Sequence, residues 1–115
     1  MKKVYFLQTC DTCRRILKEV NLEGFEQYEI KSTAITPDQL DEMYSFTQSY
    51  EALFNKRARK AKELDLKNNP ISDAEFRPLI LDEYTFLKRP VFIVDDEIFV
   101  GNSKKVIEKL KAKVS

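Results

Sequence analysis

Apolar and polar positions along the N-terminal third of the chain predict a strand, a helix and a second strand. Residues 4–8, VYFLQ, form a β-branched and aromatic run, which is typical of a strand buried on both faces. A helix follows that Asp11 or Thr12 is expected to cap and Gly24 to close. Its apolar positions share one side and are Ile16, Leu17 and Val20. Residues 25–30, FEQYEI, alternate apolar and polar residues, so we expect a strand there.

The middle of the chain has a helical pattern throughout. Thr36 is a candidate N-cap, with a proline at the first helical position and acidic residues in the first turn. Residues 49–67 look like one helix with a basic face. Ser72 and Glu75 have the spacing of a capping box at the start of another helix. We therefore expect residues 37 to about 87 to be all-helical.

Strand signals return near the C-terminus. VFIV and EIFV, residues 91–94 and 97–100, flank Asp95 and Asp96, which is the pattern of a tight hairpin. The last segment, 103–115, is expected to be a helix. Its apolar positions lie along one helical face and are Val106, Ile107, Leu110 and Val114.

The order of these elements indicates the fold class. Strand–helix–strand, a helical block and then strand–strand–helix predict an α/β protein. We expect one domain over residues 1–115, with the helical insert at about 37–87. A chain of 115 residues is long enough for one domain with its own core and short for two.

Composition and charge narrow the functional classes. The chain has 20 basic and 19 acidic residues, and this net charge of +1 gives no argument for direct binding to nucleic acid or to an anionic membrane. No apolar run approaches a membrane span, and the N-terminal run is too short for a signal peptide. We therefore expect a cytoplasmic protein, and the near-neutral charge predicts a monomer.

The only two cysteines, Cys10 and Cys13, are separated by two residues, and the chain contains no histidine. The absence of histidine excludes His-based zinc sites and Cys-His or Ser-His-Asp catalysis. Three interpretations of the pair remain: a redox site, half of a metal site completed by another chain, or two small core residues. We expect no metal.

The position of the pair favours redox chemistry. Cys10 is expected between the end of the first strand and the start of the first helix, where helix amides favour a thiolate. Arg14 and Arg15 in the first turn would add to that effect. Cys13 is one helical turn further on and is placed to resolve a mixed disulfide on Cys10.

Two basic segments are further candidates. Lys88, Arg89 and Pro90 come directly before the VFIV strand, where a proline is often only an edge residue. The second segment is a run of basic residues on the expected middle helix: Lys56, Arg57, Arg59, Lys60 and Lys62. Most such runs are solvated helix faces. The alternative is that Arg57 contacts an anionic substrate or an acidic partner.

Three segments in this order resemble the family of glutaredoxin-linked arsenate reductases, including its Spx transcription-factor branch. They are TCDTCRRIL (9–17), ALFNKRARKAKELDL (52–66) and FLKRPVFIVDDEIFVG (86–101). The resemblance covers nearly the whole chain. It implies a thioredoxin/glutaredoxin-like fold with a helical insert, with Cys10 as nucleophile. It also implies that Pro90 is in cis and faces the cysteine loop, with Arg89 beside Cys10.

The arsenate reductases of this family imply a substrate and a reductant. They attack arsenate with the cysteine matching Cys10, glutathione resolves the adduct, and a glutaredoxin clears the mixed disulfide. Three arginines hold the oxyanion. Arg89 matches one of them, while the others fall at Asn55, with Arg57 two residues away, and near Asn102. Gln8 also stands where the family usually has proline, two residues before the cysteine.

The Spx branch implies a different role. Its members use both cysteines as an intramolecular redox switch and bind the C-terminal domain of the RNA polymerase α-subunit. They usually continue past the last helix, whereas this chain ends at Ser115. A third group of relatives carries the fold without an established activity.

We predict a thiol-dependent oxidoreductase of the arsenate-reductase type. Cys10 and Cys13 are the expected catalytic residues, and the expected substrate-binding residues are Arg89, Arg57, Arg14 and Pro90. No bound cofactor is expected, and glutathione is the expected co-substrate, with glutaredoxin as a partner. The alternative is an Spx-like regulator that binds RNA polymerase through a Cys10–Cys13 disulfide switch.

Overall fold

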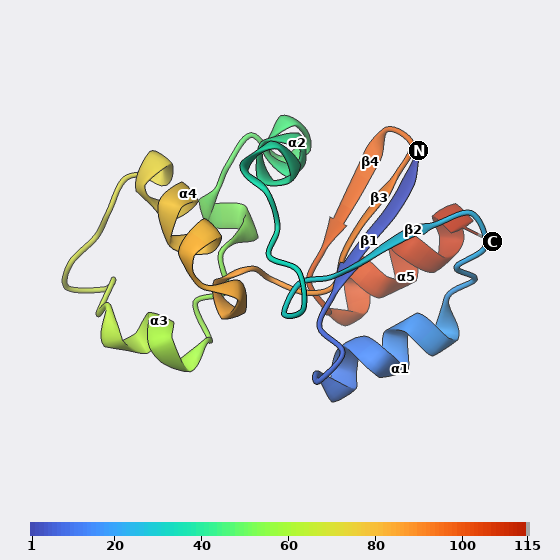
Figure 1. The fold of residues 1–115 in the computed structure, drawn as a ribbon, viewed down its shortest axis with the longest axis horizontal. Helices are drawn as coiled ribbons and strands as arrows, with labels where there is room; N and C mark the ends of the chain where they lie inside the picture. Colours follow the sequence, from blue (N-terminus) through green and yellow to red (C-terminus); the bar gives the residue numbers. More distant parts are fainter. Residues whose placement is uncertain (115) are drawn as a thin grey trace. The chain divides into compact units, whose positions relative to one another are not determined.

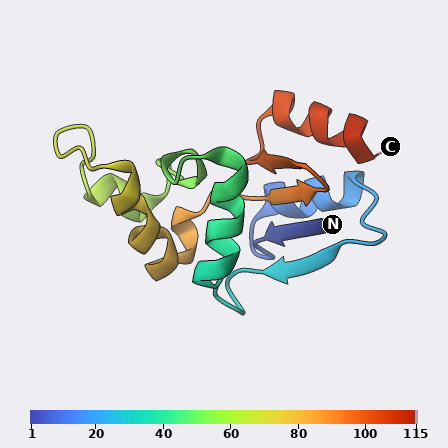
Figure 2. The same cartoon turned by 90° about the horizontal axis from the view of Figure 1, so that it is seen from above.

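The computed structural model describes residues 1–114, and its central element is a four-stranded mixed sheet (Figure 2). The strands lie in the order β2-β1-β3-β4 and comprise β1 (Lys2–Phe6), β2 (Glu26–Glu29), β3 (Val91–Val94) and β4 (Glu97–Val100). β1 pairs parallel to β2 and antiparallel to β3, and β3 pairs antiparallel to β4. The β3–β4 hairpin turns at Asp95 and Asp96, as the sequence predicts.

Two helices cover one face of this sheet, α1 (Asp11–Glu19) and α5 (Lys104–Val114) (Figure 1). Alternating strand side chains and one stripe of each helix form the core between them: Val4, Ile16, Val20, Phe92, Val94, Phe99, Ile107 and Leu110. Strand residues of the other parity are buried too, since Tyr5, Val91 and Ile93 are fully covered. Sheet and helices make one compact unit, residues 1–33 and 89–115.

Residues 34–88 form a second compact unit, built from helices joined by irregular segments. Its elements are α2 (Pro37–Thr47), the 3-10 helix η1 (Glu51–Leu53), α3 (Arg59–Glu63), α4 (Asp73–Asp82) and the 3-10 helix η2 (Tyr84–Phe86). Inside it, the ring of Phe54 packs against the rings of Phe76 and Phe86, with centroids 4.9 and 5.0 Å away.

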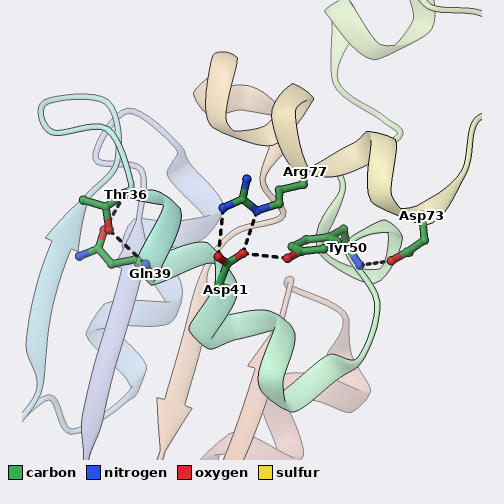
Figure 3. A network of polar contacts seen from close by, with 6 residues as sticks. All are labelled: Thr36, Gln39, Asp41, Tyr50, Asp73 and Arg77. Carbon is green, nitrogen blue, oxygen red and sulfur yellow. Dashed lines mark hydrogen bonds and ion pairs between the residues drawn. The ribbon is translucent and has the colours of Figure 1, made fainter.

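Polar contacts fasten the helices of the second unit to one another (Figure 3). The Asp41 carboxylate accepts two hydrogen bonds from Arg77, at 2.9 and 3.0 Å, and a third from the Tyr50 hydroxyl at 2.7 Å. The Asp73 carboxylate accepts from the backbone N–H of Tyr50 at 3.0 Å. α2 therefore contacts both α4 and the segment that follows α2.

The N-terminus of α2 is capped as the sequence predicts. The backbone N–H of Gln39 donates to the Thr36 hydroxyl at 3.1 Å, and the Gln39 side chain accepts from the Thr36 N–H at 2.9 Å. Ser72 also precedes its helix, but its hydroxyl donates to the Glu75 carboxylate at 3.1 Å and caps no backbone N–H. The prediction of a second capping box is therefore wrong, although Ser72 is the N-cap of α4 as predicted.

The prediction of one helix over residues 49–67 is wrong. Two short helices, η1 and α3, lie in this stretch, and the backbone between them is extended at Phe54 (φ −85°, ψ 131°). The cause is a strand-like pairing with the segment after α4. Lys88 donates to the Leu53 carbonyl at 2.8 Å and Asn55 donates to the Phe86 carbonyl at 2.7 Å. Those backbone groups are not free to continue a helix.

The α/β class is confirmed, and so is the predicted succession along the chain of strand, helix and strand, then helices, then two strands and a helix. The first strand begins two residues earlier than predicted and ends at Phe6. That both units form one domain stays a prediction. Within residues 1–114, none of the helices has the length and apolar character needed to cross a bilayer.

Candidate functional site

Cys10 occupies the N-cap of α1, at the end of a tight turn that follows β1. Its N–H donates to the Leu7 carbonyl at 3.1 Å and closes that turn, and its own carbonyl accepts from the Arg14 N–H at 3.1 Å. The Cys10 backbone is extended (φ −92°, ψ 115°), as N-cap residues are. The prediction that Asp11 or Thr12 caps this helix is therefore wrong, because the helix begins one residue after the cysteine.

Cys13 lies in the first turn of the same helix, and its side chain is fully buried. Both cysteines are free thiols, and they share a hydrogen bond. Burial is the main reason that the pKa of Cys13 rises to about 11, and the negative charge on Cys10 raises it further. Cys13 is thus held as a neutral thiol that donates a proton toward Cys10.

The pKa of Cys10 shifts in the opposite direction to that of Cys13. Partial burial disfavours its thiolate, but this effect is outweighed by hydrogen bonds from the Cys13 backbone N–H and the Cys13 thiol, by the positive charge of Arg89 and by the Thr12 N–H. Together these groups lower the pKa of Cys10. Because only the thiolate is nucleophilic, the lowered pKa favours Cys10 over Cys13 as the nucleophile, and that role stays a prediction.

Arg89 and Pro90 reach the site from the start of β3. The Arg89–Pro90 peptide bond is cis, in agreement with the expectation from the family resemblance. Pro90 is buried, and its carbonyl accepts from the Gly101 N–H at 2.9 Å. The Arg89 charge lowers the pKa of both cysteines. The structure therefore brings Cys10, Cys13 and Arg89 together, as the family resemblance implies.

The other two predicted substrate-binding arginines have different surroundings. Arg14 is exposed, and its guanidinium forms an ion pair with Asp11 in the same helical turn. Arg57 is exposed in the second unit, where its backbone N–H donates to the Asn55 side chain at 3.1 Å. Asn55 also donates from its amide side chain to the Thr85 carbonyl at 3.4 Å. Substrate binding by Arg14 and Arg57 stays a prediction.

Sequence reasoning missed one residue of the site. Glu29 is the last residue of β2, and its carboxylate accepts from the backbone N–H of Gln8, two residues before Cys10, at 2.8 Å. An acidic residue at the end of a strand gives no recognisable motif. The only available signal is that β2 is expected to run parallel to β1, which brings the ends of both strands to the same edge.

This arrangement supports thiol chemistry. An ionisable thiol at a helix N-terminus attacks an electrophilic sulfur or an oxyanion centre, and a neutral thiol one turn away supplies the second sulfur. Arg89 offers a fork of N–H donors that suits a carboxylate or an oxyanion. Among the described residues, no three His, Cys, Asp or Glu side chains gather as metal ligands do.

Comparison with known proteins gives a consistent result. The model of the ArsC family matches residues 5–110. The global transcriptional regulator Spx 2 of Bacillus cereus is 24% identical over 110 residues, which cover 92% of this chain and 83% of the relative. The global transcriptional regulator Spx of Streptococcus mutans is 22% identical, over 88% of this chain and 76% of the relative.

Solved structures share the fold over almost the full chain. The protein SACOL0876 from Staphylococcus aureus COL is 28% identical, with a TM-score of 0.74 and coverage of 95% of this chain and 97% of that one. An arsenate reductase from Vibrio cholerae is 17% identical, with a TM-score of 0.73 and coverage of 99% and 97%. The thioredoxin-like fold is thus confirmed. At family level, two kinds of protein are supported, a thiol oxidoreductase and an Spx-like regulator.

Proposed function

Because the chain belongs to the ArsC family, we propose that it is a thiol-dependent oxidoreductase with Cys10 as its nucleophile. The observation that carries this proposal is the asymmetry of the cysteine pair. Cys10 has a lowered pKa at the helix N-terminus, and Cys13 is a buried neutral thiol that hydrogen-bonds to it. A nucleophile and a second sulfur are the two groups that a thiol-disulfide reaction needs.

The reaction proposed for this site is the reduction of an oxyanion such as arsenate. The Cys10 thiolate attacks the arsenic atom, an S–As bond forms, and one oxygen leaves as water after protonation. A second thiol then attacks the Cys10 sulfur and loses its proton. The S–As bond breaks, and its electron pair reduces As(V) to As(III), which leaves as arsenite. The two electrons thus come from the two sulfur atoms that end in a disulfide.

The source of the second thiol determines the product. With glutathione as co-substrate, Cys10 ends in a mixed disulfide, and a glutaredoxin thiolate attacks the glutathione sulfur and frees Cys10. With Cys13, the product is a Cys10–Cys13 disulfide that an external dithiol must reduce. The close contact of the two thiols supports the second route, and the exposed part of Cys10 supports the first.

Arg89 is the group proposed to hold the anion. A guanidinium donates two parallel hydrogen bonds to an oxyanion, and each charge-assisted bond contributes about 1.5–3 kcal/mol. By the family resemblance, the other two arginine positions fall at Asn55 and near Asn102, so this chain has fewer charges for the task. We therefore expect arsenate to bind weakly unless Arg57 contributes.

Arsenate-dependent oxidation of NADPH, with glutathione, glutaredoxin and glutathione reductase present, tests this function. Turnover that requires arsenate and disappears in Cys10→Ser is the expected result. In Cys13→Ser, turnover that persists indicates the glutathione route, and turnover that is lost indicates the internal disulfide. Turnover that persists in Cys10→Ser contradicts the proposal, because another group would then be the nucleophile.

The second candidate is an Spx-like regulator, and the hydrogen bond between Cys10 and Cys13 is the observation that favours it. Sulfur atoms in contact within one helical turn can join with little movement of the backbone. Oxidation would convert the two cysteines to a disulfide and pass two electrons to the oxidant, with release of two protons when Cys10 is protonated and of one when it is a thiolate. The curated relatives reported above are transcriptional regulators.

Binding to the C-terminal domain of the RNA polymerase α-subunit tests this candidate. The purified chain is titrated with that domain in dithiothreitol and again after oxidation with diamide, with the Cys10→Ser, Cys13→Ser double variant as the redox-insensitive control. An affinity that differs between the two states, and differs only in the wild type, supports a switch. Absence of binding in both states excludes this role.

A further inference from the structure

Glu29 joins the two loops that follow the neighbouring strands β1 and β2. Its Oε2 accepts from the Gln8 N–H at 2.8 Å, in the loop after β1. Its Oε1 accepts from the N–H groups of Lys31 at 2.9 Å and Ser32 at 2.6 Å, in the loop after β2. One carboxylate therefore serves three backbone donors, one oxygen to each loop.

Gln8 directly follows Leu7, whose backbone contacts both cysteines. The Leu7 carbonyl accepts from the Cys10 N–H at 3.1 Å, and the Leu7 N–H contributes a hydrogen bond at the Cys13 sulfur. Residues 7–10 form a tight turn, with Gln8 at its second position. Anything that fixes Gln8 also fixes the turn that places both thiols.

We propose that Glu29 is a positioning residue of the Cys10–Cys13 site, which it holds through the Gln8 N–H and the Leu7–Cys10 turn. The proposal deepens the function proposed above and rests on Cys10 being its reactive thiol. Glu29 does not touch the thiols and takes no part in a bond-forming step. Its contribution is to keep Cys10 at the N-cap of α1, where the Cys13 and Thr12 amides and Arg89 favour the thiolate.

Two explanations of a Glu29 effect differ in sign. If Glu29 acted only as a negative charge near Cys10, its removal would favour the thiolate and speed alkylation at neutral pH. If it positions the turn, its removal takes Cys10 away from the amides and the guanidinium that favour the thiolate. Alkylation would then become slower. The direction of the change thus separates positioning from simple electrostatics.

Gln8→Pro is a second variant that tests the same contact. Proline suits the second position of a tight turn because its ring fixes φ, yet it has no N–H to donate to Glu29. In the Gln8→Pro background, the turn is held by the ring, and Glu29 has no contact left through which to act. The effect of Glu29→Ala should therefore be lost in that background.

The experiment measures the rate of Cys10 alkylation by iodoacetamide from pH 5 to 9, identified by mass spectrometry. The variants are Glu29→Ala, Glu29→Gln, Gln8→Pro and the Gln8→Pro, Glu29→Ala double variant. Glu26→Gln is the matched control, since it removes a carboxylate from the other end of β2. Amide hydrogen exchange at Cys10 follows the turn independently of thiol reactivity.

We expect Glu29→Ala to slow alkylation at pH 7 roughly three- to tenfold and to move the pH profile upward. Exchange of the Cys10 amide should become faster. Glu29→Gln, which keeps an acceptor oxygen, should recover most of the wild-type rate, and Glu26→Gln should match the wild type. Faster alkylation, or unchanged exchange at Cys10 in Glu29→Ala, overturns the positioning role.

Failure of the proposed function gives a different result. If Cys10 of the wild type is alkylated at pH 7 no faster than an unperturbed cysteine thiol, its proposed role as the nucleophile is contradicted. The positioning of the turn would then still be decided by amide exchange at Cys10, which does not depend on the reactivity of its sulfur. Equal effects of Glu29→Ala in the wild-type and Gln8→Pro backgrounds would show that Glu29 does not act through Gln8, and would overturn the proposal.

Discussion

Arg89 illustrates how a nearby charge adds to the hydrogen bonds that favour a thiolate. Its guanidinium favours the Cys10 thiolate, and removal of that charge should raise the pKa of Cys10. We predict that Arg89→Ala slows iodoacetamide alkylation of Cys10 at pH 7 by about three- to tenfold. Arg89→Lys, which keeps a positive charge, should lie between the alanine variant and the wild type.

The exposed Arg15 provides the control for this prediction. Arg15→Ala also removes one positive charge, from the first turns of α1. Arg15 is not among the residues that lower the pKa of Cys10. It should leave the alkylation profile close to that of the wild type. Equal slowing by both variants would mean that the general positive potential of the surface, rather than the placement of Arg89, activates the thiol.

At the residue scale, much of the site follows from sequence because its residues belong to short, recognisable motifs. The CxxC after a first strand and the Lys-Arg-Pro before a later one identify Cys10, Cys13 and Arg89, which the structure brings together. Glu29 could not be identified in this way. It acts through backbone groups, and any residue other than proline at positions 8 and 32 would offer the same N–H donors.

Among the helices, α2 has the most complete set of start signals. Thr36 and Gln39 cap each other's backbone N–H groups in a capping box. We predict that Thr36→Ala lowers the free energy of unfolding by about 1 kcal/mol, because the Gln39 N–H loses its acceptor. Urea denaturation measures the change. Thr36→Ser keeps the hydroxyl and should be close to the wild type, so an equal loss in both variants would assign the effect to packing.

The start of α2 and the β3–β4 hairpin were predicted correctly, and the single helix over residues 49–67 was not. The cap of α2 and the hairpin of β3 and β4 depend on neighbouring residues alone. The helical composition of residues 49–67 would favour one helix. Pairing of Leu53 and Asn55 with the segment after α4 interrupts it, and composition contains no information about a partner more than 30 residues away.

At the scale of the whole molecule, carboxylates with lowered pKa values determine the response to acid. Hydrogen bonds from Arg77 and then from Tyr50 lower the pKa of Asp41 from 3.8 to about 2. The folded state therefore binds this proton less readily than the unfolded state. The stability that Asp41 contributes is complete above about pH 4 and is lost as the pH falls toward 2.

We predict that Asp41→Asn removes part of this acid sensitivity. Urea midpoints measured between pH 2 and 6 should fall less steeply in the variant than in the wild type below pH 4. Asp82→Asn, at the exposed end of α4, is the control and should follow the wild-type curve. Parallel curves for Asp41→Asn and the wild type would show that the ion pair with Arg77 contributes nothing to acid stability.

The unequal proton affinities of Cys10 and Cys13 also determine how the redox couple depends on pH. Between the pKa of Cys10 and that of Cys13, about 11, the reduced pair carries one proton. Forming the disulfide there releases two electrons but one proton, so the midpoint potential should change by about 30 mV per pH unit, and by about 59 mV per pH unit below the Cys10 pKa. Equilibration with dithiothreitol buffers across pH would locate the break between the two slopes. A single slope of about 59 mV per pH unit from pH 5 to 9 would contradict the asymmetry. Above about pH 9, where both thiols of an ordinary dithiol ionise and its potential loses its pH dependence, this pair would thus keep a slope of about 30 mV per pH unit until the pKa of Cys13 is reached.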